Sequence, residues 1–255
     1  MDIVTIDDPR YADYEDLILR RDQVKKEAFE ASQDYIRRFG QLINDRFAAE
    51  IACIREKKII AYCQRMLNRN LPIEDTKLDN FIEREMNEYQ AQLDAMIAEK
   101  AAIDKANQSV SEYQMSQIRS IYRQIAKRIH PDIAPDLFAH PDVQDLWAKT
   151  NSDYNCNDYY GIKDDQVTLN RLLERYQGEG LSLDIPDIAS CLDRLRKEIA
   201  EVTSRDPYLY RELLADEDAC LEKEETLRKD IKDYQDYLVT LKKETAAFPI
   251  KKVGN

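Results

Sequence analysis

The sequence is poor in glycine, histidine and tryptophan. Among its 255 residues there are only five Gly, two His and one Trp. Phosphate-cradling loops and dinucleotide fingerprints need closely spaced glycines, and no such motif occurs. No nucleophile signature built on Ser or Cys is present either. We therefore expect a protein that is not an enzyme, with no catalytic residues and no cofactor.

Long hydrophobic runs are also missing. No run of about 18 apolar residues occurs, so the sequence predicts no membrane span and no membrane partner. The opening residues, MDIVTIDD, lack the basic and apolar segments of a secretory signal. The five Cys are widely spaced and form no Cys-x-x-Cys pair, which is typical of reduced thiols. These features predict a cytoplasmic protein.

Charge is plentiful, but its overall sign does not suit nucleic acid. The 38 basic and 50 acidic side chains give a formal net charge of -12. Phosphate contacts need clustered Lys and Arg, so no nucleic-acid partner is expected. Charged residues make up 35% of the chain, and a hydrophobic share of 43% recurs largely at helical spacing. This composition predicts an all-α protein with long solvated helices.

Residues 1–113 are predicted to form a long antiparallel coiled-coil hairpin. A break at Asn-Leu-Pro, residues 70–72, separates two long helices that carry apolar residues at heptad spacing. The second helix is predicted to continue without interruption through Ser111 into the next region. Because heptad seams can be satisfied within one chain or between chains, a homo-oligomer stays open. Representative seam residues are Leu17, Val24 and Ala31 in the first helix and Tyr89, Met96, Ile103 and Val110 in the second.

Residues 163–255 are predicted to form a second antiparallel helix pair. One helix follows Asp184-Ile-Pro186, and the other follows Asp206-Pro207, an Asp cap with Pro at the first helical position. Between the two long regions, residues 114–162 are predicted to form a third unit, a short helical hairpin.

The most informative segment lies in that short hairpin. From Gln114 to Pro131 there is no acidic residue. At ~100° per residue, its apolar residues share one helix face and its basic residues form a separate stripe. Pro131 has no amide hydrogen and disfavours helical geometry at His130, so the helix should end near Ile129. A basic helix that leads into a turn with His130 and Asp132 at its tip predicts a surface for an acidic partner.

This segment resembles the J-domain family of DnaJ-like co-chaperones. In that family a basic amphipathic helix with a Tyr-Arg pair ends in a His-Pro-Asp loop, and a second helix folds back antiparallel. The match covers about residues 117–160, with Trp147, Thr150 and Asp153-Tyr154 on the returning helix. The resemblance implies docking to a DnaK-type chaperone, stimulation of its ATPase, and a client protein that the sequence does not identify. The residues that it implies for partner binding are Arg119, Tyr122, Arg123, Lys127, Arg128, His130, Pro131 and Asp132.

The sequence departs from the family pattern before and after this segment. No Tyr-Tyr-x-x-Leu-Gly opening helix precedes Gln117, and a heptad-patterned helix stands in its place. Ile133-Ala134 replaces the Lys-Asn that often follows the turn, and the next stretch is acidic. The alternative function is a structural coiled-coil scaffold that carries a degenerate J-like hairpin.

A second His-Pro-Asp triplet begins at His140. Its Pro141 and Asp142 suit the first turn of a helix, so it is interpreted as a helix start. Two His and two Asp in such triplets suggest a mixed ligand set for zinc or iron. Helical ligand pairs usually stand four residues apart, however, and these do not, so no metal site is expected.

Overall fold

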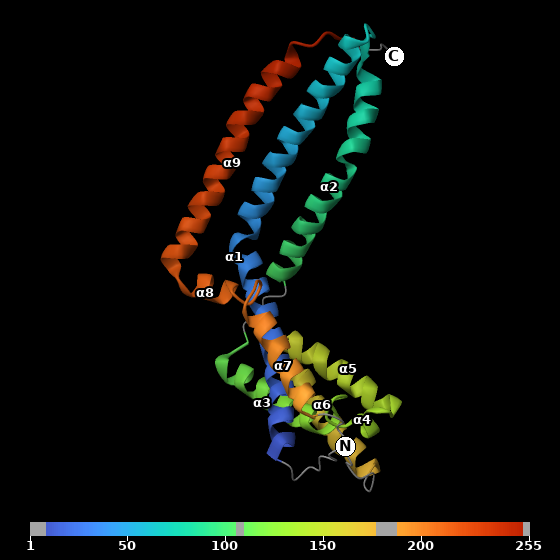
Figure 1. Ribbon diagram of the computed structural model, residues 1–255, viewed down its shortest axis with the longest axis vertical. Coiled ribbons are helices and arrows are strands. Elements are labelled where there is room, and N and C mark those ends of the chain that lie inside the picture. The colour runs from blue at the N-terminus through green and yellow to red at the C-terminus, as the bar shows by residue number, and fades with distance from the viewer. Residues whose placement is uncertain (1–8, 106–109, 177–187, 252–255) are drawn as a thin grey trace. The chain divides into compact units, whose positions relative to one another are not determined.

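The computed structural model describes residues 9–105, 110–176 and 188–251 (Figure 1). Nearly all of these residues lie in helices, so the predicted all-α fold is confirmed. None of the described helices is long and apolar enough to cross a membrane. The helices are α1 (Pro9–Asn68), α2 (Asp75–Lys105), α3 (Glu112–Ile129), α4 (Pro135–Phe138), α5 (Pro141–Asn155), α6 (Tyr159–Arg175), α7 (Ile188–Thr203), α8 (Tyr210–Ala215) and α9 (Glu217–Ala246). Two short parallel strands, β1 (Ile73–Glu74) and β2 (Ile250–Lys251), pair in addition.

The chain forms two compact units, and α1 supplies residues to both. The first unit contains residues 1–31 and 108–209, and the second contains residues 32–107 and 210–255. The boundaries predicted at residues 113 and 162 differ from this division. Ile18, on the N-terminal part of α1, is fully buried among residues of the first unit.

The core of the first unit is built from α3, α5 and α6. The apolar face of α3 packs on both of the other helices, and Leu19 of α1 joins the same cluster. Tyr122 stacks on Tyr154 with ring centroids 3.8 Å apart. His130 meets Trp147 edge-on at 4.9 Å. Residues late in α3 therefore lie beside residues early in α5, and the two helices run in opposite directions.

A second cluster in the first unit joins α1 to α7. Ile18 of α1 packs with Leu195 of α7 and with Ile133, which follows the α3 turn, and all three are 0–1% exposed. These contacts place α7 in the first unit, whereas α9 belongs to the second. The structure thus differs from the predicted C-terminal pair, because the apolar side of α7 packs on α1.

Helix α3 begins independently of α2. Ser111 is its N-cap, with extended backbone (φ -66°, ψ 154°). The Ser111 hydroxyl accepts a hydrogen bond from the Gln114 N–H at 3.3 Å, and the Gln114 side chain accepts one from the Ser111 N–H at 3.0 Å. This reciprocal capping box satisfies backbone donors that a continuous helix would leave to preceding carbonyls. The predicted uninterrupted helix through Ser111 is therefore wrong.

The second unit consists mainly of residues 32–68 of α1 flanked by α2 and α9 (Figure 1). The Lys58 ammonium lies 2.8 Å from the Glu85 carboxylate, and the Tyr62 and Phe81 rings lie 5.0 Å apart, so α2 pairs with α1 in reverse order. Helix α9 follows α1 in the same order. Its pairs with α1 are Arg46–Asp230, Cys53–Tyr234 and Glu56–Thr245.

Candidate functional site

Helix α3 presents opposite faces of different chemistry, as its sequence predicts. Ile118, Ile125 and Ile129 are 0% exposed and form part of the core. Arg119, Arg123 and Lys127 share the other side of the helix and are exposed, and Arg128 in the last turn is exposed as well. We call these four residues the basic face of α3. The described structure therefore confirms the separation of packing and charge on this helix.

The turn after α3 is closed by hydrogen bonds to His130. His130 has extended backbone (φ -61°, ψ 134°), as the following Pro131 requires, and it ends the helix where predicted. Its carbonyl accepts from the N–H groups of Ile133 at 2.9 Å and Ala134 at 2.8 Å. Its ring Nδ1 accepts from the Asp132 N–H at 3.0 Å. The His130 ring and backbone together fix the position of Asp132.

His130 is buried, although it lies at the turn. Only 3% of the residue is exposed. Because Nδ1 accepts the Asp132 N–H, the ring hydrogen resides on Nε2. Nε2 lies 3.3 Å from the Asp22 carboxylate of α1, to which it donates. The Asp132 side chain is 37% exposed and stays accessible. The sequence placed both residues at the tip of the turn, yet the structure leaves Asp132 the more accessible of the two.

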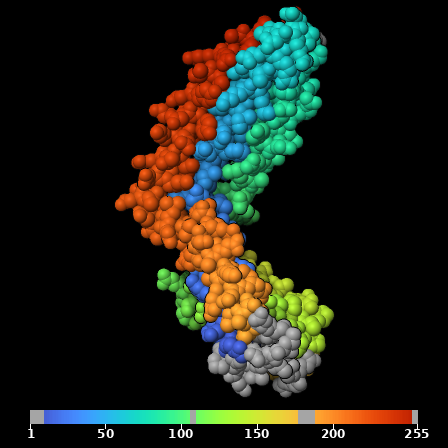
Figure 2. Space-filling view, viewed as in Figure 1, coloured from blue at the N-terminus to red at the C-terminus, as the bar shows by residue number. Residues whose placement is uncertain are grey.

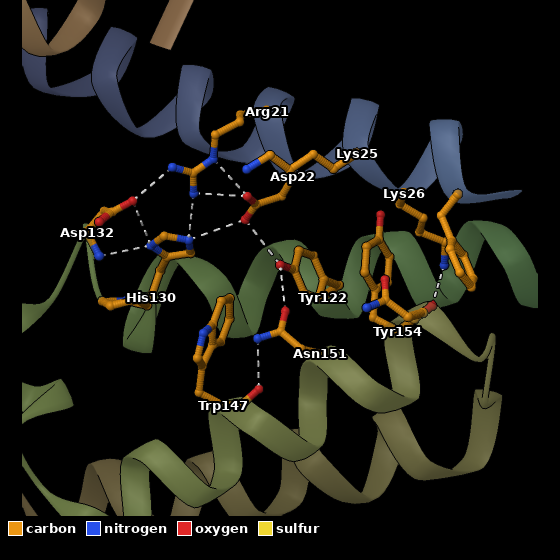
Figure 3. A pocket seen from close by; sticks show the side chains of 13 residues that line it. Arg21, Asp22, Lys25, Lys26, Tyr122, His130, Asp132, Trp147, Asn151 and Tyr154 are labelled. Carbon is orange, nitrogen blue, oxygen red and sulfur yellow. Dashed lines mark hydrogen bonds and ion pairs between the residues drawn. The ribbon is translucent and has the colours of Figure 1, made fainter. Parts of the chain in front are cut away.

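Asp22 is the common acceptor of the site (Figure 3). It accepts from Arg21 at 3.0 Å and from the Tyr122 hydroxyl at 3.2 Å, as well as from His130. Arg21 also donates to the Asp132 carboxylate at 3.1 Å. Burial acts to raise the pKa of Asp22, but the His130 hydrogen bond and the Arg21 charge outweigh it and hold the pKa below its ordinary value. Burial, together with the Asp22 charge, raises the pKa of Tyr122.

Lys26 extends this polar network one turn further along α1. Its side chain is 2% exposed, and its ammonium lies 3.7 Å from the centre of the Tyr154 ring. It donates to the Tyr154 carbonyl and, at 2.6 Å, to the Asn157 side chain. Glu30 lies 3.7 Å away. Burial lowers the pKa of Lys26 to about 8, because the charged form loses hydration that these partners replace only in part.

Two residues of the basic face reach partners on α1. Arg123 donates to the Gln23 side chain at 2.8 Å, and Lys127 forms an exposed ion pair with Glu15 at 2.9 Å. Arg119 and Arg128 have no hydrogen-bond or ion-pair partner within the described part of the chain. The structure thus gathers all eight residues that the sequence singled out around one helix and its turn. It adds Arg21, Asp22 and Lys26, for which the sequence gives no local signal.

The second triplet begins a helix, as predicted. His140 is the N-cap of α5 and Pro141 occupies the first turn. Asp142 accepts from the Tyr176 hydroxyl at 2.9 Å and from Arg175 at 2.8 Å. His140 stacks on the Tyr176 ring at 4.1 Å. Over residues 9–105, 110–176 and 188–251, no group of three or more His, Cys, Asp or Glu side chains could hold a metal ion.

Comparisons with protein-family models, with curated proteins and with solved structures give no match to this chain. The fold and the site define an all-α protein with a buried polar network beneath a basic helix. Its function is therefore inferred from the residues of the site themselves.

Proposed function

We propose that the protein is an adaptor of the co-chaperone type. In this proposal it docks a DnaK-type chaperone through the basic face of α3 and the turn at residues 130–132, and it stimulates that partner's ATPase. The chain itself is not an enzyme, and it works in the cytoplasm. The observation that carries the proposal is the exposed basic face, which ends directly at a turn where Asp132 stays accessible.

The energetics of the basic face support docking. Lys127 and Glu15 pair at the surface, and exposed pairs of this kind contribute only ~0–1 kcal/mol. A partner carboxylate can replace Glu15 at small cost. Arg119 and Arg128 are exposed without a partner among the described residues, so no bond within that part of the chain has to break. Although the chain has a net charge of -12, this face is locally positive and would attract an acidic groove of the partner.

The buried His130 has a positioning role in this proposal. Its Nδ1 holds the Asp132 N–H and its Nε2 holds Asp22, so the ring connects the turn to α1. A His130→Gln substitution removes this geometry, because the glutamine amide cannot place a donor and an acceptor where the ring nitrogens lie. We expect the turn to lose its fixed position relative to the basic face.

The test is the steady-state ATPase rate of a DnaK-type chaperone from the same source, with and without the protein. We expect stimulation by the wild type and its loss in an Arg123→Glu/Lys127→Glu double variant. The matched control is Lys242→Glu/Lys243→Glu, which reverses two exposed charges on α9 and should stimulate normally. Absence of stimulation by the wild type, or full stimulation by the α3 variant, would overturn the proposal.

One observation favours a second candidate, a structural coiled-coil scaffold. Both ring nitrogens of His130 hydrogen-bond to groups of its own chain, and the residue is 3% exposed. A residue bound in this way serves the fold whether or not a partner is present. A pull-down from the source organism separates the two functions: if the Arg123→Glu/Lys127→Glu variant keeps every partner of the wild type, the scaffold is favoured.

A further inference from the structure

We propose that the groove between α1 and α5 is a docking site for an acidic peptide segment of a partner protein, which inserts one large apolar side chain. The groove is a cavity of about 450 Å³ within the first unit. That volume falls in the range of ~300–1,000 Å³ at which proteins hold ligands. It is lined in part by Lys25, Phe29, Trp147, Asn151 and Asn155.

Each wall of the groove is one face of a helix. Arg21, Lys25 and Phe29 stand four residues apart on α1, and residues at that spacing share a face. Trp147, Asn151 and Asn155 repeat this spacing on α5 and form the opposite wall. Figure 3 shows the two walls with Tyr122 and His130 between them. The groove therefore runs for about two helical turns, ~12 Å, which suits a short peptide segment.

The apolar part of the groove is open to a ligand. Phe29 is 48% exposed, although it is a large hydrophobic residue on a helix with a well-packed opposite side. Trp147 of the other wall is half-buried and already contacts the rings of Tyr122 and His130. An apolar side chain that enters between the walls would remove more of both aromatic surfaces from water. Aromatic anchors of this kind dominate the affinity of protein–peptide contacts.

The charges of the groove select an acidic ligand. Arg21 is engaged by Asp22 and Asp132, and Lys26 by Glu30 and backbone. Lys25 is exposed and has no hydrogen-bond or ion-pair partner among the described residues. It is the one cation of this lining that is free to meet a carboxylate. Asn155 is also exposed, and its amide offers both a donor and an acceptor to a peptide backbone.

This site adjoins the surface proposed for the chaperone, because Pro131 and Asp132 of the turn also line the groove. The two tests change different residues: Lys25 and Phe29 of α1 test the groove, whereas Arg123 and Lys127 of α3 test the chaperone surface. Peptide binding in the groove can therefore be present when ATPase stimulation is absent, and the reverse also holds. Failure of the peptide-binding test therefore does not imply failure of the ATPase test.

The test uses the full-length protein and a displayed library of random 12-residue peptides as the probe. We expect the enriched peptides to share one large apolar residue and at least one Asp or Glu. Fluorescence anisotropy with a labelled synthetic copy then gives the Kd. We expect Lys25→Glu and Phe29→Ala each to raise the Kd at least ten-fold, and the remote control Lys242→Glu to leave it unchanged. Binding should also change the emission of Trp147, the single tryptophan of the chain.

Both test residues are exposed, so their variants should fold, and circular dichroism checks this. Three outcomes would overturn the proposal: no enrichment of any peptide, enrichment of basic or purely polar peptides, or binding that both groove variants retain. Enrichment of peptides that match this chain's own acidic segments would identify a second copy of the chain as the occupant. That result would overturn the proposal that the occupant is a separate protein.

Discussion

The two units use one helix, α1, in different ways. In the first unit α1 turns charged side chains inward: the side chains of Arg21, Asp22 and Lys26 are 13%, 14% and 2% exposed. In the second unit the ion pairs between α1 and α9 lie nearer the surface: the Arg46 side chain is 36% exposed and pairs with Asp230, although Glu56 is buried and accepts from Thr245. The apolar contacts there come from residues such as Phe39.

The burial of charge in the first unit indicates where the molecule requires a defined geometry. Buried charges are costly unless they are paired and hydrogen-bonded, so a network such as that around Asp22 tolerates few alternative arrangements. A unit held by apolar contacts and surface ion pairs tolerates more alternative arrangements, because the energy of apolar contacts depends on buried area. The first unit therefore contains the site with a defined geometry, the network around Asp22, and the second unit is held mainly by its helix packing.

The largest expected effect tests the apolar packing of the second unit. Phe39 is 0% exposed and packs on Cys220 and Leu227 of α9. Phe39→Ala should lower the free energy of unfolding of this unit by about 4 kcal/mol, because it leaves a cavity. Urea unfolding followed by far-UV circular dichroism should show the loss. The Trp147 emission transition, which reports on the first unit, should move much less. Equal shifts in both signals would show that the two units do not unfold separately.

The next effect tests the buried network of the first unit. Asp22→Asn leaves Arg21, Tyr122 and His130 without their shared carboxylate and should cost about 3 kcal/mol, because it breaks a buried ion pair. Urea unfolding followed by Trp147 emission measures it. The control is Asp13→Asn, an exposed acid of the same helix, which should change little. A wild-type midpoint in Asp22→Asn would show that the network is not a source of stability.

A third effect depends on pH. The pKa of Lys26 is lowered to about 8 in the folded state, so between pH 8 and its ordinary value of 10.5 the unfolded state binds more protons. Folding stability from this group therefore rises with pH in that window. From pH 7 to 9.5 the wild type should gain about 2 kcal/mol relative to Lys26→Met. Paired urea titrations at both values measure this difference. A constant difference would show that Lys26 is not buried as a strained cation.

The smallest effect belongs to a surface pair of the second unit. Arg46→Met removes the 3.0 Å contact with Asp230 and the guanidinium that lies over the Tyr234 ring, but it keeps an unbranched aliphatic side chain. We expect a loss below about 1 kcal/mol, because both charges are partly exposed. Thermal unfolding in low and high salt measures it, and the small difference should vanish in high salt. A loss as large as that of Asp22→Asn would remove the distinction between the units.

The local features of the fold were predictable from sequence, whereas the partners of each face were not. The amphipathic face of α3, its end before Pro131 and the helix start at His140 depend on neighbouring residues, and the structure confirms them. The heptad residues Val24 and Ala31 are buried as a seam should be. A periodic seam does not specify which helix covers it. Val24 and Ala31 lie in the unit that contains α3, not in the unit that contains α2.

The missed part of the site has the same cause. Arg21 and Asp132 are 111 positions apart, and no local pattern joins two such charges. On a helix with many exposed acids and bases, Asp22 and Lys26 are indistinguishable from surface residues by type or spacing. Only the approach of α3 and α5 makes them interior groups. Because residues 1–113 are predicted to form one hairpin, the whole first helix is assigned to a single partner helix. The contacts of its N-terminal part with α3 and α5 are therefore not predicted.

The discontinuity of the first unit has a consequence for biosynthesis. Its two stretches, residues 1–31 and 108–209, are separated by most of the second unit. At roughly 5–20 residues per second, the ribosome takes on the order of 6–20 seconds to add the 111 positions from Arg21 to Asp132. During that interval the nascent helix displays Ile18 and the Arg21–Asp22 pair without the segments that cover them. The beginning of this chain is thus made first, but its unit is completed only after residues 32–107 of the second unit have been made.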